Sequence, residues 1–124
     1  MPRTEVRFFK DARGRVPVRE WLRDLLRRDR RAHAKCVVRI QLLEAMGYEL
    51  RRPMADSLRD GIHELRGRTG NVNYRILYFF HGRNVAVLAH ALTKEDVVPD
   101  ADIDRAREAK ALVGQSPDRH IHQE

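Results

Sequence analysis

Basic side chains suited to binding phosphate are concentrated in residues 61–94. Arg66 and Arg75 carry guanidinium groups, whose planar arrangement of donors matches the oxygens of a phosphate. Lys94 adds a compact cation, and His90 stands close to it in the sequence. Imidazole is the side chain that exchanges protons near neutral pH. These residue types could together cleave RNA without a metal, which requires a base for the 2′-OH, a cation for the phosphate and an acid for the leaving 5′-oxygen.

Four further residues of the same stretch could contact RNA or donate a proton. Tyr78 is a candidate catalytic proton donor, and Tyr74 could stack on a base. Arg68 and Arg83, which both stand in predicted turns, are candidate RNA-binding residues. The two tyrosines also have a structural interpretation, because they share a strand face with apolar residues and core packing would suit at least one of them.

The charged candidates have structural alternatives as well. Arg66 could pair with Glu64 or Glu95 at a strand end, and His90 could be a half-buried histidine that is satisfied by hydrogen bonds. Arg75 is the strongest candidate. It stands alone among apolar residues, and burying a charge costs free energy unless the charge serves a purpose.

Three short strands must position these side chains. They are predicted over residues 62–66, 72–80 and 85–92, and glycine-containing turns join them. Connections this short make neighbouring strands antiparallel, so the three strands form a meander. The middle strand is apolar on both faces, which predicts a central strand covered on both sides. Its alternation places Tyr74 and Tyr78 on one face and Arg75 on the other.

The remaining elements are helices and one more strand. A short strand is predicted over residues 5–10, and two amphipathic helices follow it as a hairpin, the first opening at Pro17 and the second ending at Gly47. Residues 48–60 have little periodicity and are interpreted as a connection. Pro99 opens a last helix with an acidic first turn. The sequence therefore predicts an α+β fold: a small antiparallel sheet with an N-terminal strand, a helical hairpin, a three-stranded meander and a C-terminal helix.

Length and charge restrict the classes of protein. A chain of 124 residues is long enough for one domain, which we expect over residues 1–114, with residues 115–124 as a polar flexible tail. The net charge of +7 favours a polyanionic partner such as nucleic acid, or an acidic protein inhibitor. A basic protein that binds neither is the alternative.

The sequence predicts no cofactor, no metal and no membrane segment. The single cysteine, Cys36, allows no disulfide and no cysteine zinc site within the chain, which favours a reducing compartment. His120 and His122 are too few for a metal site. No stretch reaches the roughly 20 apolar residues of a membrane span. A cytoplasmic protein is therefore expected.

Three segments and a downstream pattern resemble a known toxin family: DGIHELR at residues 60–66, NYRILYF at residues 73–79, HALTK at residues 90–94, then Pro99, Ile103 and Ala106. In this order they resemble the HigB-like, phage-derived branch of the RelE/ParE toxin superfamily. The resemblance implies a RelE-like fold. It also implies the toxin of a type II toxin–antitoxin system, a metal-independent, ribosome-dependent mRNA endonuclease (an mRNA interferase) that inhibits translation. The implied partners are mRNA on the ribosome and a helix-turn-helix antitoxin protein.

The chain departs from the family pattern at the end of the third predicted strand. Leu92 stands where the family usually has an aromatic residue, and Lys94 is followed by Glu95 where a second lysine is common. A lysine after a strand is also common on any protein surface. A second hypothesis therefore stays open: a non-catalytic or gyrase-directed binding protein on the toxin fold.

Overall fold

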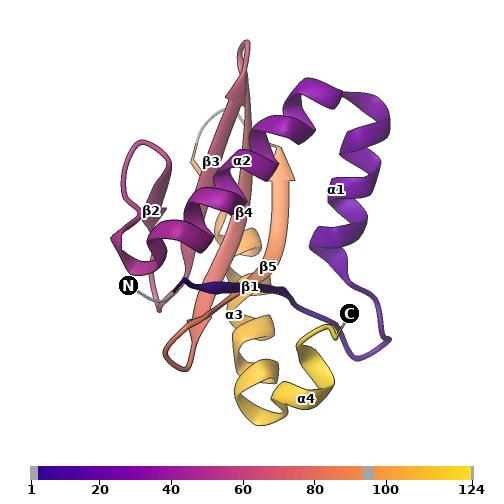
Figure 1. The fold of residues 1–124 in the computed structure, drawn as a ribbon. Helices are drawn as coiled ribbons and strands as arrows, with labels where there is room; N and C mark the ends of the chain where they lie inside the picture. Colours follow the sequence, from indigo (N-terminus) through magenta and orange to yellow (C-terminus); the bar gives the residue numbers. More distant parts are fainter. Residues whose placement is uncertain (1–2, 94–96, 124) are drawn as a thin grey trace.

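The chain folds into a five-stranded sheet with helices on both faces (Figure 1). The computed structural model describes residues 3–93 and 97–123. The elements in chain order are β1 (Glu5–Phe8), α1 (Pro17–Arg28), α2 (Arg30–Met46), the 3₁₀ turn η1 (Gly47–Glu49), β2 (Ala55–Ser57), β3 (His63–Thr69), β4 (Val72–His81), β5 (Val85–Thr93), α3 (Asp100–Gln115) and α4 (Pro117–His120). The predicted α+β class and order of elements are confirmed.

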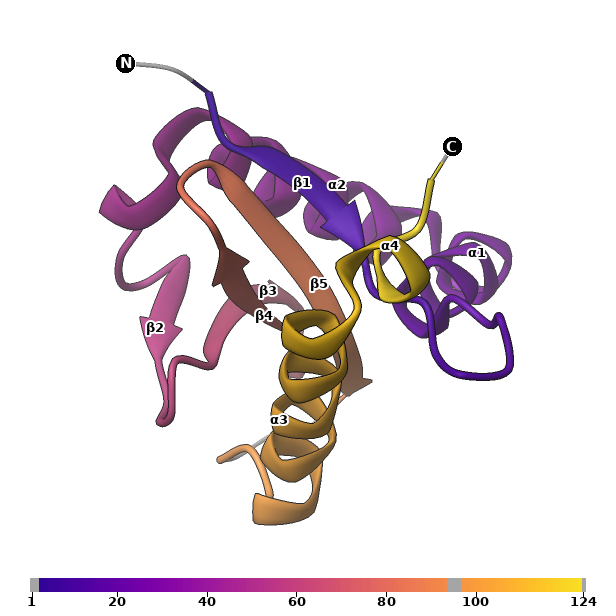
Figure 2. The same cartoon turned by 90° about the horizontal axis from the view of Figure 1, so that it is seen from below.

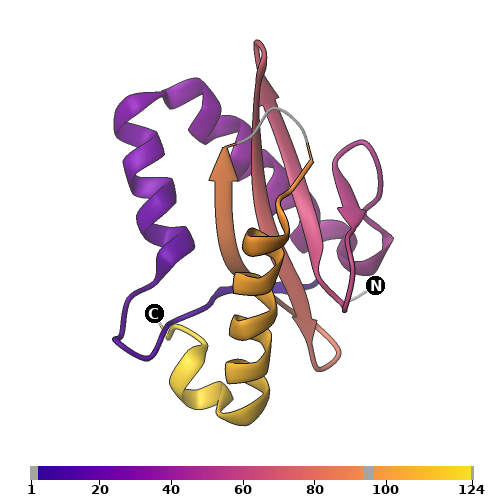
Figure 3. The same cartoon turned by 180° about the vertical axis from the view of Figure 1, so that it is seen from behind.

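The strands lie in the order β1-β5-β4-β3-β2. β3, β4 and β5 form the predicted antiparallel meander. β1 pairs with β5 in parallel, so the sheet as a whole is mixed rather than antiparallel. β4 lies at the centre of the sheet, as its apolar sequence predicted. Figure 2 shows the sheet between two layers of helices, with α1 and α2 on one side and α3 on the other. Figure 3, seen from behind, shows α3 in front of the sheet.

Each face of the sheet has its own core. The core under the helix hairpin includes Val18, Leu22, Leu25, Cys36, Leu43, Tyr74, Ile76, Tyr78 and Leu88. The core under α3 includes Phe9, Ile62, Leu77, Phe79, Val87, Leu92, Ala106, Ala109 and Val113. The side chains of β4 alternate between the two cores, because successive residues of a strand point to opposite faces.

Local sequence signals set the ends of the two hairpin helices. Pro17 occupies the first turn of α1, where its missing N–H does no harm. The Asp29 carboxylate accepts a hydrogen bond from the Ala32 N–H at 3.1 Å and caps α2. Gly47 ends α2 with a positive φ of 53°, and a Cβ at this position would collide with the Thr4 side chain. No helix in the described part of the chain is long and apolar enough to cross a membrane.

Two details of the meander differ from the prediction. Residues 48–60, expected to be a connection, contain β2, which has three residues and pairs with β3 at the sheet edge. So short a strand leaves no periodicity in the sequence. β3 also extends through Thr69, so the hairpin turn is confined to Gly70 and Asn71 and Arg68 belongs to the strand. The glycine-rich sequence predicted an earlier turn than the backbone adopts.

Residues 116–122, part of the expected flexible tail, lie against the rest of the domain. Residues 117–120 form α4, and the side chain of His120 is buried. Its Nδ1–H donates to the Lys10 carbonyl at 2.8 Å, and Ile121 forms an antiparallel bridge with Phe9. The segment is too short and too polar to show periodicity, so its docking on β1 depends on tertiary contacts that the local sequence does not reveal.

Candidate functional site

A buried carboxylate holds two of the predicted arginines together. Glu64 is 1% exposed, and its Oε1 accepts from the Nε of Arg66 at 2.6 Å. One terminal nitrogen of Arg75 donates to both carboxylate oxygens, at 3.0 and 3.1 Å. The strand register explains this contact: Arg66 lies directly opposite Arg75, and Glu64 lies two residues along β3 on the same face. Arg75 therefore does have a structural partner, as the sequence allowed for Arg66.

The ion pairs continue to the sheet edge. Arg66 also donates to the Asp56 carboxylate at 3.2 Å, and Arg52 donates to the same oxygen at 2.7 Å. The hydrogen bond from Arg52 is the largest of the contacts that hold the pKa of Asp56 below its ordinary value. We call these five residues, Arg52, Asp56, Glu64, Arg66 and Arg75, the arginine–carboxylate cluster. Three cations against two carboxylates leave the cluster with an excess of positive charge.

His90 forms a second polar pair on the same face of the sheet. Its Nε2 lies 2.6 Å from Oδ1 of Asp102, in the first turn of α3. A carboxylate only accepts hydrogen bonds, so Nε2 carries the proton and the Nδ1 of a neutral ring is the acceptor. The two side chains are 18% and 21% exposed. The pair is thus partly sheltered but reachable from solvent.

The sheet register relates this pair to the cluster. His90 lies opposite Leu77, and Leu77 lies opposite Glu64, so the three side chains share one face. Adjacent strands are about 4.8 Å apart, which places the backbones of Glu64 and His90 roughly 10 Å from each other. Leu92 lies opposite Arg75 and is buried in the core under α3. Lys94, predicted as a further catalytic cation, lies outside the described residues.

The structure does not bring the two predicted tyrosines to this site. Tyr74 and Tyr78 are 7% and 2% exposed in the core under the helix hairpin, on the opposite face from Arg75. Burial raises the pKa of Tyr78 to about 12, which makes the phenol a poor source of protons. The predicted catalytic role of Tyr78 and stacking role of Tyr74 are therefore corrected. Strand alternation separates both residues from Arg75, although they are its near neighbours in sequence.

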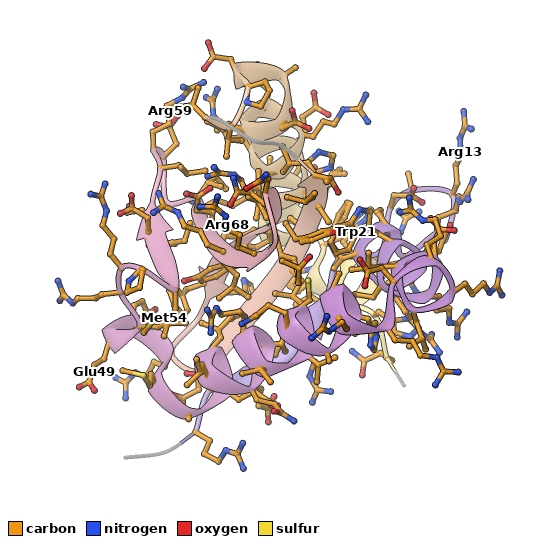
Figure 4. All side chains as sticks on the ribbon, turned by 90° about the horizontal axis from the view of Figure 1, so that it is seen from above. Arg13, Trp21, Glu49, Met54, Arg59 and Arg68 are labelled. Atoms are coloured by element: carbon orange, nitrogen blue, oxygen red, sulfur yellow. The ribbon has the colours of Figure 1, made fainter. Side chains whose placement is uncertain are left out.

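The two predicted RNA-binding arginines lie at opposite ends of the meander. Arg68 is exposed near the tip of β3, on the same strand face as Arg66, and its Nε donates to the Gly70 carbonyl at 2.9 Å (Figure 4). Arg83 lies in the turn between β4 and β5, beside Tyr48 rather than near the cluster. Arg68 can therefore extend the cluster, whereas Arg83 belongs to a separate surface.

Sequence reasoning missed three polar residues of the site. Arg52 and Asp56 belong to the segment interpreted as a connection, and Asp102 was attributed only to the helix dipole. The acidic first turn of α3 was a usable signal for Asp102, because a helix that starts after a strand end carries its first turn close to that strand. No local pattern marks Arg52 or Asp56.

Metal-binding and thiol chemistry receive no support from the described residues. Over residues 3–93 and 97–123, no group of three or more His, Cys, Asp or Glu side chains lies close enough to hold a metal ion. Cys36 is buried, and burial raises the pKa of its thiol to about 11. A thiol with so high a pKa is a weak nucleophile at neutral pH. The candidate chemistry is therefore that of the arginines and His90.

Comparison with known proteins relates this site to a family. Residues 20–111 match the family model described as phage derived protein Gp49-like, which covers well over half of the chain. The chain belongs to the phage-derived Gp49-like family. The Gp49-like family is a RelE-like toxin family, so the predicted toxin-type class and the phage-derived character are confirmed. The matched range runs from α1 to α3 and contains the arginine–carboxylate cluster and both members of the His90–Asp102 pair. The search of curated proteins found no match.

Proposed function

We propose that this Gp49-like protein is the toxin of a type II toxin–antitoxin system, and that it cleaves mRNA on the ribosome and so inhibits translation. The observation that carries this function is the position of the His90–Asp102 pair on the same sheet face as the arginine–carboxylate cluster. Metal-free cleavage needs a proton acceptor and cations for the phosphate, and this face holds both.

The cluster serves to hold the scissile phosphate. Glu64 orients the guanidinium groups of Arg66 and Arg75 before any RNA binds, and such preorganised charges stabilise a transition state more than mobile ones do. The Arg66 side chain is 35% exposed and the Arg75 side chain 12%, so Arg66 is the more accessible of the two. The excess positive charge of the cluster favours an anionic ligand.

His90 then acts as the general base. Its Nδ1 takes the proton of the 2′-OH while the 2′-oxygen bonds to phosphorus and the bond from phosphorus to the 5′-oxygen breaks. The products are a 2′,3′-cyclic phosphate and a 5′-hydroxyl, whose proton a cationic acid supplies; Lys94 is the sequence candidate for that role. Asp102 holds the imidazole in the tautomer that leaves Nδ1 as acceptor and stabilises the imidazolium that forms.

A helix-turn-helix antitoxin and a cytoplasmic site of action complete the proposal. An antitoxin could silence the toxin by placing acidic side chains over the arginine–carboxylate cluster, for which charge complementarity provides the physical basis. Ribosome-bound mRNA, the proposed substrate, places the activity in the cytoplasm.

Mapping of mRNA 5′ ends after brief expression tests this function. Wild-type protein should create new ends within translated frames. At equal protein level, Arg75→Ala should abolish these ends, and His90→Ala should slow cleavage about 10²- to 10⁴-fold, the usual contribution of general acid–base catalysis. Arg13→Ala is the matched control, because Arg13 points into solvent from the turn before α1, away from the cluster (Figure 4). Cleavage that survives both Arg75→Ala and His90→Ala would contradict these roles.

The internal pairing of Arg66 and Arg75 favours a second candidate function. Guanidinium groups that already share a buried carboxylate can be structural, which suits a non-catalytic or gyrase-directed binding protein on the same fold. Growth arrest with DNA damage and intact mRNA would support the gyrase-directed version. A folded, harmless protein that binds an antitoxin tightly would support the non-catalytic one.

A further inference from the structure

A pocket beside β2 lies at the edge of the sheet, apart from the His90–Asp102 pair. Its volume is about 400 Å³, within the range of small-ligand sites. It lies where η1 and the segment after it approach β2 and the start of β3. The lining residues that matter here are Tyr48, Arg51, Arg52, Asp56, Ser57 and His63.

Tyr48 is an exposed ring with a rigid backing. It stacks on Phe80, with ring centroids 3.8 Å apart and planes 26° from parallel, yet 61% of the residue is exposed. Phe80 and His63 form a T-shaped contact, and His63 in turn stacks on the buried Tyr78. A ladder of rings therefore leads from the core to the surface and ends at Tyr48. One face of this ring is covered by Phe80, which leaves the rest available to a flat ligand.

The backbone holds Tyr48 in place. Gly47 precedes it with a positive φ, and its missing Cβ leaves room for the Thr4 side chain. The Thr4 N–H donates to the Glu44 carbonyl at 2.9 Å, so the residue before β1 is hydrogen-bonded to the end of α2. A ring that is already ordered loses little conformational entropy when a ligand binds.

Arginines flank Tyr48 on two sides. Arg51 and Arg52 line the pocket beside β2. Arg83 and Tyr48 line a neighbouring pocket of about 280 Å³. Arg52 also belongs to the arginine–carboxylate cluster through Asp56, so a continuous series of ion pairs runs from Arg75 to the edge of this pocket.

We propose that Tyr48 is a stacking platform for one base of a single-stranded RNA, with Arg51 and Arg83 contacting the phosphates on either side. An aromatic face next to arginines is the usual combination for single-stranded nucleic acid, since every base can stack and every nucleotide carries a phosphate. This inference rests on the proposed function, because it names where the RNA strand continues beyond the cleavage centre along the ion pairs.

The polar lining of the pocket suits a nucleobase. Burial is the main cause that lowers the pKa of His63, so its imidazole is neutral at pH 7 and can both donate and accept hydrogen bonds. The Asp56 carboxylate accepts, and the Ser57 hydroxyl can do either. The edge of a base stacked on Tyr48 could therefore form hydrogen bonds with these side chains.

Binding of an uncleavable RNA tests the platform separately from cleavage. The probe is a fluorescein-labelled RNA of about 12 nucleotides with 2′-O-methyl groups, which removes the attacking hydroxyl, measured by anisotropy at low salt. Tyr48→Ala should weaken binding about 5- to 150-fold, the range for losing one stacked base. Tyr48→Phe keeps the ring and should stay within about twofold. Leu26→Ala removes an exposed apolar side chain of α1 that lines neither pocket, and it should have no effect.

Two further measurements separate stacking from general damage to the fold. Tyr48→Leu keeps apolar contact with Phe80 but lacks an aromatic face, so it should bind as weakly as Tyr48→Ala while unfolding at the wild-type temperature. Salt dependence should be unchanged by both variants, whereas Arg51→Ala should reduce the slope of log Kd against log salt by about one. A probe containing 2-aminopurine should lose fluorescence on wild-type protein and not on Tyr48→Leu.

Several results would overturn the platform. The platform is wrong if the wild-type protein does not bind the RNA, or if Tyr48→Leu binds it as tightly as the wild type. It is also wrong if Tyr48→Leu binds RNA normally but binds the antitoxin more weakly, because Tyr48 would then be a protein contact. Tyr48-dependent binding without new mRNA ends after expression would leave the platform intact and reject only the nuclease function.

Discussion

The two faces of the sheet use the same strands for different purposes. On the face under α3, Arg66, Glu64 and Arg75 form ion pairs, and His90 pairs with Asp102. On the face under the helix hairpin, rings and aliphatic side chains pack without ion pairs between them, as in the edge contact of Trp21 with Tyr74 and the packing around Tyr78. Since neighbouring residues of β4 point to opposite faces, closeness in sequence to Arg75 does not place a residue in its site.

The two faces also depend on their contacts in different ways. The apolar face, under the helix hairpin, is stabilised by the removal of many side chains from water, so its stabilisation is spread over many contacts. The face under α3, which we call the polar face because it carries the ion pairs, contains the Glu64 carboxylate, which is 1% exposed. A buried charge of this kind destabilises the fold unless its cations stay in place. A defect in the polar face should therefore cost more stability than its few residues suggest.

Removing that carboxylate should produce the largest effect. Glu64→Ala leaves the half-buried guanidinium groups of Arg66 and Arg75 without the charge that balances them, and we expect the free energy of unfolding to fall by about 3–5 kcal/mol. Urea denaturation at pH 7 measures it. Glu44→Ala removes a partly exposed carboxylate 4.0 Å from the exposed Arg3 and should change stability by less than about 1 kcal/mol. Equal losses of unfolding free energy in Glu64→Ala and Glu44→Ala would contradict the claim that the buried carboxylate depends on its cations.

The orientation of His90 provides the next comparison. Asp102→Asn keeps the shape of the side chain but removes the charge that holds the imidazole, so mRNA cleavage should slow about 10- to 100-fold, part of the contribution of general acid–base catalysis. Asp104→Asn, in an exposed ion pair with Arg107 on the same helix, should cleave as the wild type does. Tyr78→Phe should also retain activity, because the phenol lies on the other face. Primer extension on a translated mRNA gives the three rates. Activity that depends on Tyr78 and not on Asp102 would reverse the assignment of the faces.

The burial of Tyr78 on the apolar face should make the stability of the protein fall at high pH. Burial raises the pKa of Tyr78 from an ordinary value of 10.0 to about 12, so the folded state favours the neutral phenol. The resulting stability is complete below pH 10 and is lost as the pH rises through 12. The total is about 2–3 kcal/mol, because each pKa unit corresponds to about 1.4 kcal/mol. Urea denaturation between pH 8 and pH 12 should show this loss in the wild type and in the control Tyr48→Phe. Tyr78→Phe should lose less stability, because the buried Cys36 thiol, whose pKa is also raised, still contributes. Losses of equal size in Tyr78→Phe and the wild type would contradict the burial argument.

Much of the fold could be predicted because its signals are local. Pro17, Asp29 and Gly47 mark helix ends through their own backbone and capping chemistry. Residues 72–80 are apolar at both alternating sets of positions, which marks a strand covered on both faces. The short β2 and the docked α4 could not be predicted in this way, because neither is long enough to show a period.

The candidate site was predictable only in part. Arg66, Arg75 and His90 stand out by residue type, and the sequence alone puts Arg75 on the opposite face from Tyr78. Their partners did not stand out. Asp56 reaches Arg66 from another strand, and Asp102 reaches His90 from α3, so both contacts depend on how separate elements pack.

The sequence by itself therefore determined the order of the longer elements, the two faces of β4 and the excess of positive charge. The tertiary structure alone decided which carboxylate meets which cation, that residues 117–121 pack on β1, and that Tyr48 is stacked on Phe80 at the surface. The division has a physical reason. Turn, cap and alternation preferences act between residues a few positions apart, whereas an ion pair or a ring stack between distant segments forms only after the hydrophobic cores have brought those segments together.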